Sequence, residues 1–389
     1  MHDVLIIGGG PSGLQAARKL AGRGFDVLVL EKKKEVGRHI ICTGIVSLGI
    51  FQEFGLARES ALAEIKKMRV FSPFGSSVDY EHPRAFACVV DRERFDRSLG
   101  DKACEQGARI LTDREALDIS VGKDSVVAVT KRGKRFEEKY SASVVLIATG
   151  INYGLHRKLG LGYPRTFLKG VQAEIEIGEP DYTQVFLGKD IAPGAFAWLV
   201  PVGGGMARIG LMTQLDPEGY LERLIARFYP DRAIAFDKDH LQLKAIAQGL
   251  VSKTYGERVL AIGEAAGQVK TTTGGGIYFG LLCADIASAL VSERFADGGF
   301  SSQMLADYER RWRRAIQKEI RVGLFLRKLF SSLSDPSIEK LFHIAKNDGV
   351  IPMIRERADF DWHSDLVLAL IKRMPWADVY KSGHGSFAS

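Results

Sequence analysis

The sequence predicts an α/β fold that combines a discontinuous Rossmann-like dinucleotide-binding domain, a second domain with an antiparallel sheet, and a helical C-terminal region. Three observations lead to this prediction. A buried-strand pattern at residues 4–7 runs into a glycine-rich loop, and residues 263–277 form a second glycine-rich block after another strand-like run. Between about 165 and 250 the pattern is mostly strand-like. The 389 residues exceed the usual size of one domain, so we expect two intertwined domains.

The first glycine-rich loop, residues 8–13, is a G-x-G-x-x-G motif set between a strand and a predicted helix. Gly8 permits a tight turn, Gly10 lets the backbone approach a pyrophosphate, and Gly13 allows close packing of helix and strand. The next strand ends in Glu31, where an acid accepts a hydrogen bond from a ribose hydroxyl. An acid in place of an arginine argues against a 2′-phosphate, so the motif favours FAD or NAD over NADP.

The second block decides between these two cofactors. After a strand-like run at residues 258–262 the chain turns at Gly263 and Glu264, passes small residues, and enters a helix at residues 273–277. Such a return to the sheet places an acid near a ribityl chain and helix N-terminal amides near a flavin ring. Two glycine-rich blocks that close both ends of one large cofactor predict FAD.

Composition narrows the class of protein. Apolar residues make up 46% and charged residues 26%, which is ordinary for a soluble globular protein. No apolar run reaches membrane-spanning length, and Met1 leads almost directly into the first strand, so we expect no secretory signal. The four cysteines lie far apart, with no C-x-x-C spacing, so we expect no metal site. A cytoplasmic protein fits these features best.

Part of the net charge of +7 lies in a predicted amphipathic helix between residues 308 and 330. Apolar residues recur there at three- and four-residue steps, opposite a basic face. One interpretation is a packed helix with a solvated face, and the other is peripheral contact with an anionic membrane surface. Nucleic acid is the least favoured partner because no recognition motif accompanies the charge. The basic residues are Arg310, Arg311, Arg313, Arg314, Lys318, Arg321, Arg327 and Lys328.

The order of these patterns divides the chain. Residues 1–65, 91–155 and 251–300 are assigned to the FAD-binding domain. Residues 66–90 and 156–250 are assigned to the substrate domain, and residues 301–389 to the helical region. Within the FAD-binding domain, residues 91–107 are predicted to form a helix. Residues 381–389 are predicted to form a loose tail.

Together these segments resemble the geranylgeranyl reductase family of flavoproteins, within the larger p-hydroxybenzoate hydroxylase-like group. The resemblance rests on both glycine-rich blocks, the Cys-Thr-Gly turn at 42–44, the Asp-Arg-Glu-Arg-Phe-Asp segment at 91–96, and residues 193–201, similar to a Pro-x-x-Tyr-x-Trp-x-Phe-Pro motif. The family reduces isolated double bonds in prenyl chains. The resemblance therefore implies an FAD-dependent reductase of a prenylated lipid or isoprenoid substrate.

The resemblance also assigns residues to a site. Cys42 is the candidate catalytic residue, for tuning the flavin or supplying a proton, and the alternative is a small buried residue that lets the ring approach. Arg92 is expected to reach the flavin or its phosphates, with a surface ion pair as the alternative. The predicted cofactor site comprises Gly8, Gly10, Ser12, Gly13, Leu14, Glu31, Lys32, Cys42, Gly44, Arg92, Ala116, Gly263, Glu264, Gly274, Gly275, Gly276 and Ile277. Phe196, Trp198 and Pro201 are the predicted substrate-binding residues, with core packing as the alternative for the two aromatic rings.

This chain departs from the family pattern at several positions. Glu264 replaces an aspartate but can accept the same hydrogen bond. Thr271 replaces a proline, which is expected to loosen a turn beside the flavin. Phe196 and Val200 replace a tyrosine and an aromatic residue, so the wall stays apolar but lacks a hydroxyl.

Two other functions remain open from the sequence. One is a flavin monooxygenase or dehydrogenase of another apolar ring substrate, although Thr149 stands where many hydroxylases of the larger group carry an aspartate. The other is a carrier of prenyl lipids without catalysis, which the intact flavin glycines argue against. No second G-x-G-x-x-G follows a strand, so both NADPH and a ferredoxin-like protein are candidate electron donors.

Overall fold

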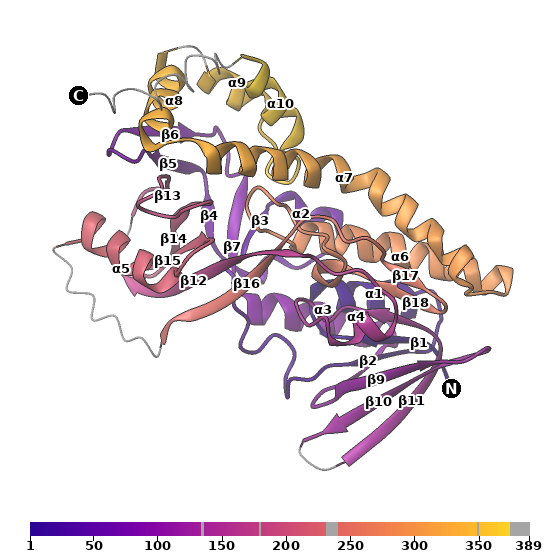
Figure 1. Ribbon diagram of the computed structural model, residues 1–389. Helices are drawn as coiled ribbons and strands as arrows, with labels where there is room; N and C mark the ends of the chain where they lie inside the picture. Colours follow the sequence, from indigo (N-terminus) through magenta and orange to yellow (C-terminus); the bar gives the residue numbers. More distant parts are fainter. Residues whose placement is uncertain (134–135, 179, 231–239, 348–349, 374–389) are drawn as a thin grey trace.

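The computed structural model describes residues 1–133, 136–178, 180–230, 240–347 and 350–373 (Figure 1). Its first sheet has five parallel strands in the order β18 (Val259–Ala261), β11 (Phe136–Ile147), β1 (His2–Ile7), β2 (Val27–Leu30) and β8 (Arg109–Leu111). β17 (Tyr255–Gly256) pairs with β18 at the edge. In β1, Val4 pairs with Val144 on one side and with Val27 on the other. Distant segments of the chain therefore meet in one sheet.

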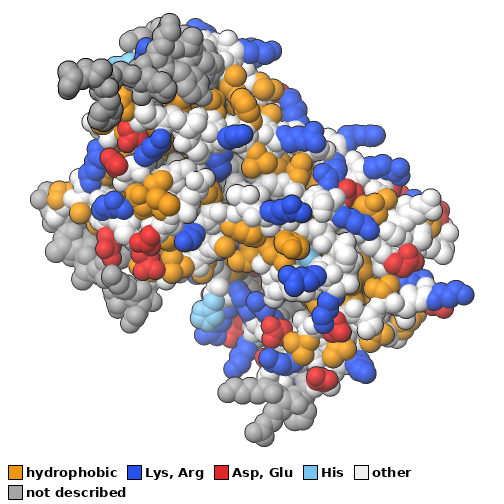
Figure 2. Space-filling model, viewed as in Figure 1, with side chains coloured by type: hydrophobic (Ala, Val, Ile, Leu, Met, Phe, Trp, Pro, Cys, Tyr) orange, Lys and Arg blue, Asp and Glu red, His pale blue; other side chains and the backbone are white. Residues whose placement is uncertain are grey.

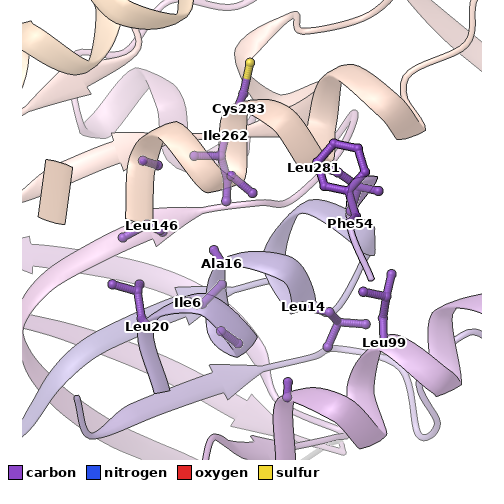
Figure 3. Close-up of a cluster of buried hydrophobic side chains, with 14 of the residues drawn as sticks. Ile6, Leu14, Ala16, Leu20, Phe54, Leu99, Leu146, Ile262, Leu281 and Cys283 are labelled. Carbon is purple, nitrogen blue, oxygen red and sulfur yellow. The ribbon is translucent and has the colours of Figure 1, made fainter. Parts of the chain in front are cut away.

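Apolar side chains leave β1 on both faces, as expected for a parallel sheet that is covered on both sides. Val4 and Ile6 contribute to a core shared with α1 (Pro11–Ala21), α3 (Arg92–Glu105) and α6 (Ile277–Asp297). Figure 3 shows side chains of β1 and these helices meeting in that core. Leu5 and Ile7 belong to a second cluster, which includes the hairpin of β9 (Glu115–Val121) and β10 (Val126–Arg132) and the helix α4 (Gly154–Lys158).

A second sheet of seven strands has the order β16 (Gln242–Gln248), β12 (Thr166–Glu176), β15 (Met206–Thr213), β14 (Ala197–Gly203), β13 (Thr183–Phe186), β5 (Lys67–Phe71) and β6 (Ser77–Glu81). Neighbouring strands in this sheet are antiparallel, except that β13 and β5 are parallel to each other. A small antiparallel sheet joins β3 (Ile45–Ser47), β7 (Ala87–Val90) and β4 (Ala61–Ile65). Short helices at Gly49–Glu53 (α2) and Arg58–Ser60 (η1) connect β3 to β4.

One helix interrupts the segment that was predicted to be mostly strand. α5 (Pro217–Phe228) begins at Asp216, whose carboxylate accepts hydrogen bonds from the backbone N–H groups of Glu218 and Gly219. Leu221 and Leu224 of this helix are buried against the second sheet. An aspartate followed by proline is a strong helix start, so Asp216 and Pro217 mark this helix within a segment of strand patterns.

The C-terminal region is helical, as predicted, and α7 (Ser302–Ser332) runs along both sheets (Figure 1). Tyr308, Trp312, Ile316 and Ile320 recur at four-residue spacing and are fully buried in the first core, which confirms the predicted apolar face. At its other end Phe330 packs with α8 (Asp335–Asn347) against β5 and β6. α9 (Val350–Arg357) and α10 (Ser364–Arg373) follow, and the predicted tail at 381–389 lies outside the described residues. None of the helices described here combines the length and the hydropathy needed to cross a membrane.

Candidate functional site

A cavity of about 450 Å³ lies at the carboxyl ends of the parallel strands, where open α/β sheets bind their ligands. Ile7, Leu30, Ala148 and Ile262, at or just past the ends of β1, β2, β11 and β18, contribute to its wall. Both glycine-rich blocks line it. The strand ends and the two glycine-rich blocks therefore enclose one continuous space, as expected for a cofactor held at both ends.

The three glycines of the first motif have different structural roles. Gly8 has φ +113°, and a Cβ there would lie 2.3 Å from the carbonyl oxygen of Ala148. A Cβ on Gly13 would lie 2.1 Å from the carbonyl oxygen of Gly8. Gly10 has an ordinary φ of −85°, and no protein atom lies within 4 Å of an added Cβ. The fold therefore requires Gly8 and Gly13, whereas Gly10 keeps space open on the cavity wall.

This open space fits the pyrophosphate of a dinucleotide. Gly10 is the N-cap of α1 and supplies no side-chain cap, so the first N–H groups of the helix remain available to an anion. Ser12 also lines the cavity, whereas Leu14 is fully buried in the core beneath the loop. The surroundings of Gly10 thus match what FAD requires at this point.

Glu31 is placed at the end of β2 by its backbone contacts. Its carboxylate accepts hydrogen bonds from the N–H groups of Gly9, at 2.6 Å, and Lys33, at 2.9 Å, and the residue is 7% exposed. Each carboxylate oxygen has a second lone pair, so the fixed carboxylate can also accept from a ribose hydroxyl. Lys32 and Ala116 line the same cavity.

The second block forms a tight loop on the opposite wall. The N–H of Lys270 donates to the carbonyl of Gly275, and the N–H of Gly274 donates to the carbonyl of Lys270, both at 2.8 Å. Gly274, Gly275, Gly276 and Ile277 line the cavity, and α6 starts at Ile277 without a side-chain cap. An added Cβ on Gly274 would lie 3.1 Å from Met212 of the second sheet. The loop therefore joins the cavity to the second sheet.

Glu264 lines the cavity but already has a charged partner. Its carboxylate lies 3.2 Å from Nζ of Lys244, which projects from β16 of the second sheet. Gly263, just before it, has φ +68° and lies beneath Ser12 rather than on the wall. Lys244 was not predicted from the sequence, because nothing local relates β16 to the second glycine block.

Thr271, which was expected to loosen its turn, makes contacts with α7. Thr271 is 1% exposed, and its hydroxyl donates to the carbonyl of Ile320 in α7 at 2.8 Å. Its own carbonyl accepts hydrogen bonds from Nε and Nη2 of Arg327, at 2.9 and 2.7 Å. Burial lowers the pKa of Arg327 to about 10. The hydroxyl adds one contact with α7 that a proline could not make, whereas Arg327 bonds to the backbone carbonyl that any residue provides.

The Cys-Thr-Gly turn carries Cys42 to the cavity wall. Gly44 has φ +78° and donates its N–H to Sγ of Cys42 at 3.3 Å, and an added Cβ would lie 2.6 Å from the carbonyl oxygen of Val90. Arg208 of β15 donates to the carbonyl of Thr43 at 2.7 Å. Glycine at position 44 and arginine at position 208 therefore fix the turn, although Gly44 itself does not line the cavity.

Arg92 is neither in a surface ion pair nor unpaired. Its guanidinium, 11% exposed, lies 3.0 Å from the carboxylate of Asp96, which is 1% exposed, and both residues line the cavity. Burial alone would lower the pKa of Arg92, but Asp96 and the nearby Cys42 thiol outweigh it, so the pKa lies above its usual value. A permanent positive charge therefore lies beside Cys42 on the cavity wall.

The predicted substrate residues Phe196, Trp198 and Pro201 do not line the cofactor cavity. Phe196 lines a second, mainly apolar cavity of about 280 Å³ between the second sheet and α7, with Leu187, Leu326 and Phe330. Trp198 packs against Phe196 and near Phe360, and its indole N–H has no partner among the described residues. Trp198 and Pro201 line neither of these two cavities, so their contact with a substrate stays a prediction.

A buried pair that sequence reasoning missed completes the wall. Nζ of Lys270 lies 2.8 Å from the carboxylate of Asp361, and both residues line the first cavity. A lysine among small residues in the second block was a usable signal. Asp361 gave none, because it lies in a segment between α9 and α10 that comes close to the block only in the folded chain.

Comparison with known proteins agrees with this arrangement. Residues 1–165 match a family model of an FAD binding domain, and residues 166–242 match the geranylgeranyl reductase catalytic domain. The second match begins at β12 and covers most of the second sheet. The sequence expectation of FAD as the cofactor is thereby confirmed.

The chain is also similar to known proteins over most of its length. The chain is 31% identical to digeranylgeranylglycerophospholipid reductase 2 of Methanothermobacter thermautotrophicus, over 87% of this chain and 90% of the relative. In fold it is similar to a geranylgeranyl bacteriochlorophyll reductase-like protein of Thermoplasma acidophilum, with a TM-score of 0.83, 23% identity and 98% of each chain covered. A p-nitrophenol 4-monooxygenase of Pseudomonas putida shares the fold at a TM-score of 0.72 and 18% identity, over 94% of this chain and 98% of that one.

Proposed function

This chain belongs to the geranylgeranyl reductase family of FAD-dependent oxidoreductases, and we propose that it saturates carbon–carbon double bonds in the prenyl chains of a lipid. The observation that carries the proposal is a cavity lined by both glycine-rich blocks and bordered by the sheet that matches the geranylgeranyl reductase catalytic domain. The relative's name specifies a glycerophospholipid with geranylgeranyl chains. By that likeness we assign a prenylated glycerolipid as the substrate class.

We assign the two halves of the cofactor to the two blocks. Glu31 would accept from the adenosine ribose, and the N-terminus of α1 at Gly10 would hold the pyrophosphate. Glu264 and the loop at residues 270–276 would line the flavin half. When bound, FAD supplies a hydride from N5 of its reduced ring. The chain's own task is then to exclude water, orient the alkene and deliver a proton.

The wall near Cys42 suits an apolar substrate. Ile40, Ile45, Val46 and Val269 line the cavity beside it and offer no hydrogen-bond donors from their side chains. An apolar wall excludes water and holds a prenyl chain without competing polar contacts. We assign the proton that the alkene needs to Sγ of Cys42, whose thiol lies beside the Arg92 guanidinium. After transfer, that guanidinium would stabilise the thiolate.

The electron donor is proposed from the absence of a second dinucleotide motif in the sequence. Without a dedicated nicotinamide site, NADPH would have to bind transiently, and a small iron-sulfur protein is the other candidate. The two are distinguished by anaerobic stopped-flow reduction of the bound flavin with each donor in turn. The donor that reduces the flavin at a rate above that of substrate turnover is the competent one.

We also propose that α7 docks on an anionic membrane surface, because a prenylated lipid must be collected from a bilayer. Four exposed residues recur along one stripe of this helix, namely Arg314, Arg321, Phe325 and Lys328. Phe325 is 54% exposed, which is unusual for a phenylalanine. Basic side chains are spread over the edge of the molecule along which α7 runs (Figure 2). A basic stripe with an exposed aromatic ring suits the interface of anionic lipids.

The function is tested by anaerobic incubation of the reduced enzyme with prenylated glycerolipids, prenyl diphosphates and prenylquinones. We expect products two daltons heavier per reduced bond, detected by mass spectrometry, with the glycerolipid preferred. The same preparation exposed to oxygen serves to test the monooxygenase alternative. A flavin hydroperoxide signal with hydroxylated product, and no mass gain of two daltons under anaerobic conditions, would replace the reductase assignment.

A further inference from the structure

Lys270 and Asp361 form a buried ion pair on the wall of the cofactor cavity. The two residues are 6% and 5% exposed, and Nζ lies 2.8 Å from the carboxylate. Nζ also donates to the carbonyl of Phe360 at 3.0 Å and lies 4.6 Å from the centre of the Phe360 ring. An ammonium group carries three N–H bonds, and its two acceptors within the described part of the chain leave one for a ligand.

The loop geometry brings this ammonium group to the cavity. A Cβ on Gly275 would lie 3.3 Å from Cε of Lys270 and 3.9 Å from Nζ. Gly275 lines the cavity. Because a glycine has no side chain, only the backbone of the loop lies beside the lysine at this position. A Cβ at position 275 would press on the lysine side chain, which would have to shift slightly. The glycine and the lysine therefore act together.

Stability alone is a poor reason for such a pair. Taking two charges out of water costs several kcal/mol for each, and apolar residues of similar volume are often as stable. Other charges on this wall are arranged differently. Lys244, paired with Glu264, is 32% exposed, so water screens its charge. The Arg92 guanidinium faces Cys42 and Asp96. Lys270 is the buried cation that lies in the second glycine block itself.

The position of FAD in the cavity gives this cation a role. A ribose at Glu31 and a pyrophosphate at the N-terminus of α1 leave the flavin half to the part lined by residues 269–277. Uptake of two electrons and one proton by an oxidised flavin leaves the ring with one negative charge. A buried cation beside that ring stabilises the reduced state over the oxidised state, and charge near the ring nitrogens tunes flavin electronics.

We propose that Lys270, positioned by Asp361, sets the reduction potential of the bound FAD. Asp361 holds the ammonium group in place and offsets part of its charge. The C-terminal segment between α9 and α10 therefore takes part in the electronics of the cofactor. This inference rests on FAD binding and is independent of which substrate the enzyme reduces.

The test uses the FAD-loaded enzyme and needs no substrate. The midpoint potential is measured at pH 7 by anaerobic titration with dithionite, together with the affinity for sulfite, which adds to N5 and leaves a negative charge on the ring. Lys270→Met is expected to lower the potential and to weaken sulfite binding about tenfold, which corresponds to about 1.4 kcal/mol. Asp361→Asn keeps the lysine and removes the offsetting charge, so the potential should rise and sulfite should bind more tightly.

Opposite signs are the signature of an electrostatic role, because a structural defect at either residue would disturb the site in the same direction. Lys318→Met is the matched control, since Lys318 pairs with Asp365 at 2.7 Å between α7 and α10 but is 60% exposed and away from the cavity. It should leave both readouts unchanged. If Lys270→Met fails to retain FAD, the Asp361→Asn variant decides alone. An unchanged or lowered potential in Asp361→Asn overturns the proposal, and so does an unchanged potential in Lys270→Met.

Discussion

Gly10 illustrates how a residue can be needed by a ligand and not by the fold. Its backbone angles suit any amino acid, and no protein atom would meet a side chain there. A side chain at Gly8 or at Gly13, by contrast, would clash with nearby backbone atoms. Substitution at position 10 therefore separates cofactor binding from folding, which substitution at the other two cannot do.

We expect Gly10→Val to fold normally but to lose FAD, because the valine side chain would occupy the position of the pyrophosphate. Flavin content after reconstitution is measured by absorbance, and folding by circular dichroism. Gly49→Val is the matched control, because Gly49 also has no atom within 4 Å of an added Cβ but does not line the cavity. Normal flavin content in Gly10→Val would show that the loop is not the phosphate site.

Cys42→Ser should keep FAD and slow single-turnover alkene reduction by roughly 100-fold, within the usual range for a lost general acid. The hydroxyl is a far weaker acid than the thiol, while the volume is nearly the same. Arg208→Met tests the support of the turn. It removes the hydrogen bond to the carbonyl of Thr43, while the cysteine at position 42 is retained. It should reduce the rate less than Cys42→Ser does. An unchanged rate in Cys42→Ser would make this cysteine a packing residue.

At the scale of single residues, sequence reasoning worked where a local pattern carries the chemistry. The glycines and Glu31 of the first motif could be predicted because a strand, a turn and a helix follow each other within a few residues. Lys244 and Asp361 could not, because each reaches the cavity through long-range contacts. The contact of Thr271 with α7 could not be predicted for the same reason, since Ile320 lies about fifty residues further along the chain.

At the scale of elements, α7 both completes the core and supports the second glycine-rich block. Its buried side completes the core, and Arg327 and Ile320 hold the loop at Thr271. Arg311 and Arg313, in the basic stretch, form ion pairs with Glu293 and Glu309. The periodicity predicted the two faces correctly. Glu309 precedes Arg313 by four residues in the same helix, so that pair follows the periodicity. The pair of Arg311 with Glu293 of α6 could not be predicted, because it depends on tertiary packing.

The exposed stripe of Arg314, Arg321, Phe325 and Lys328 is the part of α7 that we propose for membrane contact. Replacing Arg314, Arg321 and Lys328 together with Gln should weaken binding to anionic vesicles by about 3 kcal/mol, since each basic residue near such a surface contributes about 1 kcal/mol. Flotation with vesicles of phosphatidylglycerol, and of phosphatidylcholine as the neutral comparison, measures this. Binding of the native protein should fall with added salt. Equal binding to both kinds of vesicle would leave the stripe as a solvated face.

At the scale of the whole molecule, the discontinuous arrangement was predictable and the contacts between its parts were not. Two strand-and-glycine patterns far apart in the sequence both require the edge of a parallel sheet, so their meeting follows from topology. The place where α5 packs on the second sheet and the bridge that α7 makes between both sheets depend on long-range contacts. No sequence pattern in α5 or α7 predicts which sheet the helix contacts.

Because segments from the whole chain surround the cofactor, FAD should stabilise the molecule as a unit. Ligand at 100 times its dissociation constant adds about 2.7 kcal/mol to the free energy of unfolding. The holoenzyme should therefore melt several degrees above the apoenzyme, in one transition seen by both circular dichroism and flavin fluorescence. Two separate transitions, with only the first sensitive to FAD, would show that the second sheet folds without regard to the cofactor.

The wall of the cofactor cavity contains residues from Ile7 to Asp361. During synthesis the first glycine loop leaves the ribosome long before the lysine loop and the aspartate that holds it. A growing chain can therefore offer a phosphate site while its redox centre still lacks a wall, so a flavin captured early would react with oxygen instead of with substrate. We expect chains arrested before residue 361 to oxidise a bound reduced flavin faster than the finished protein does.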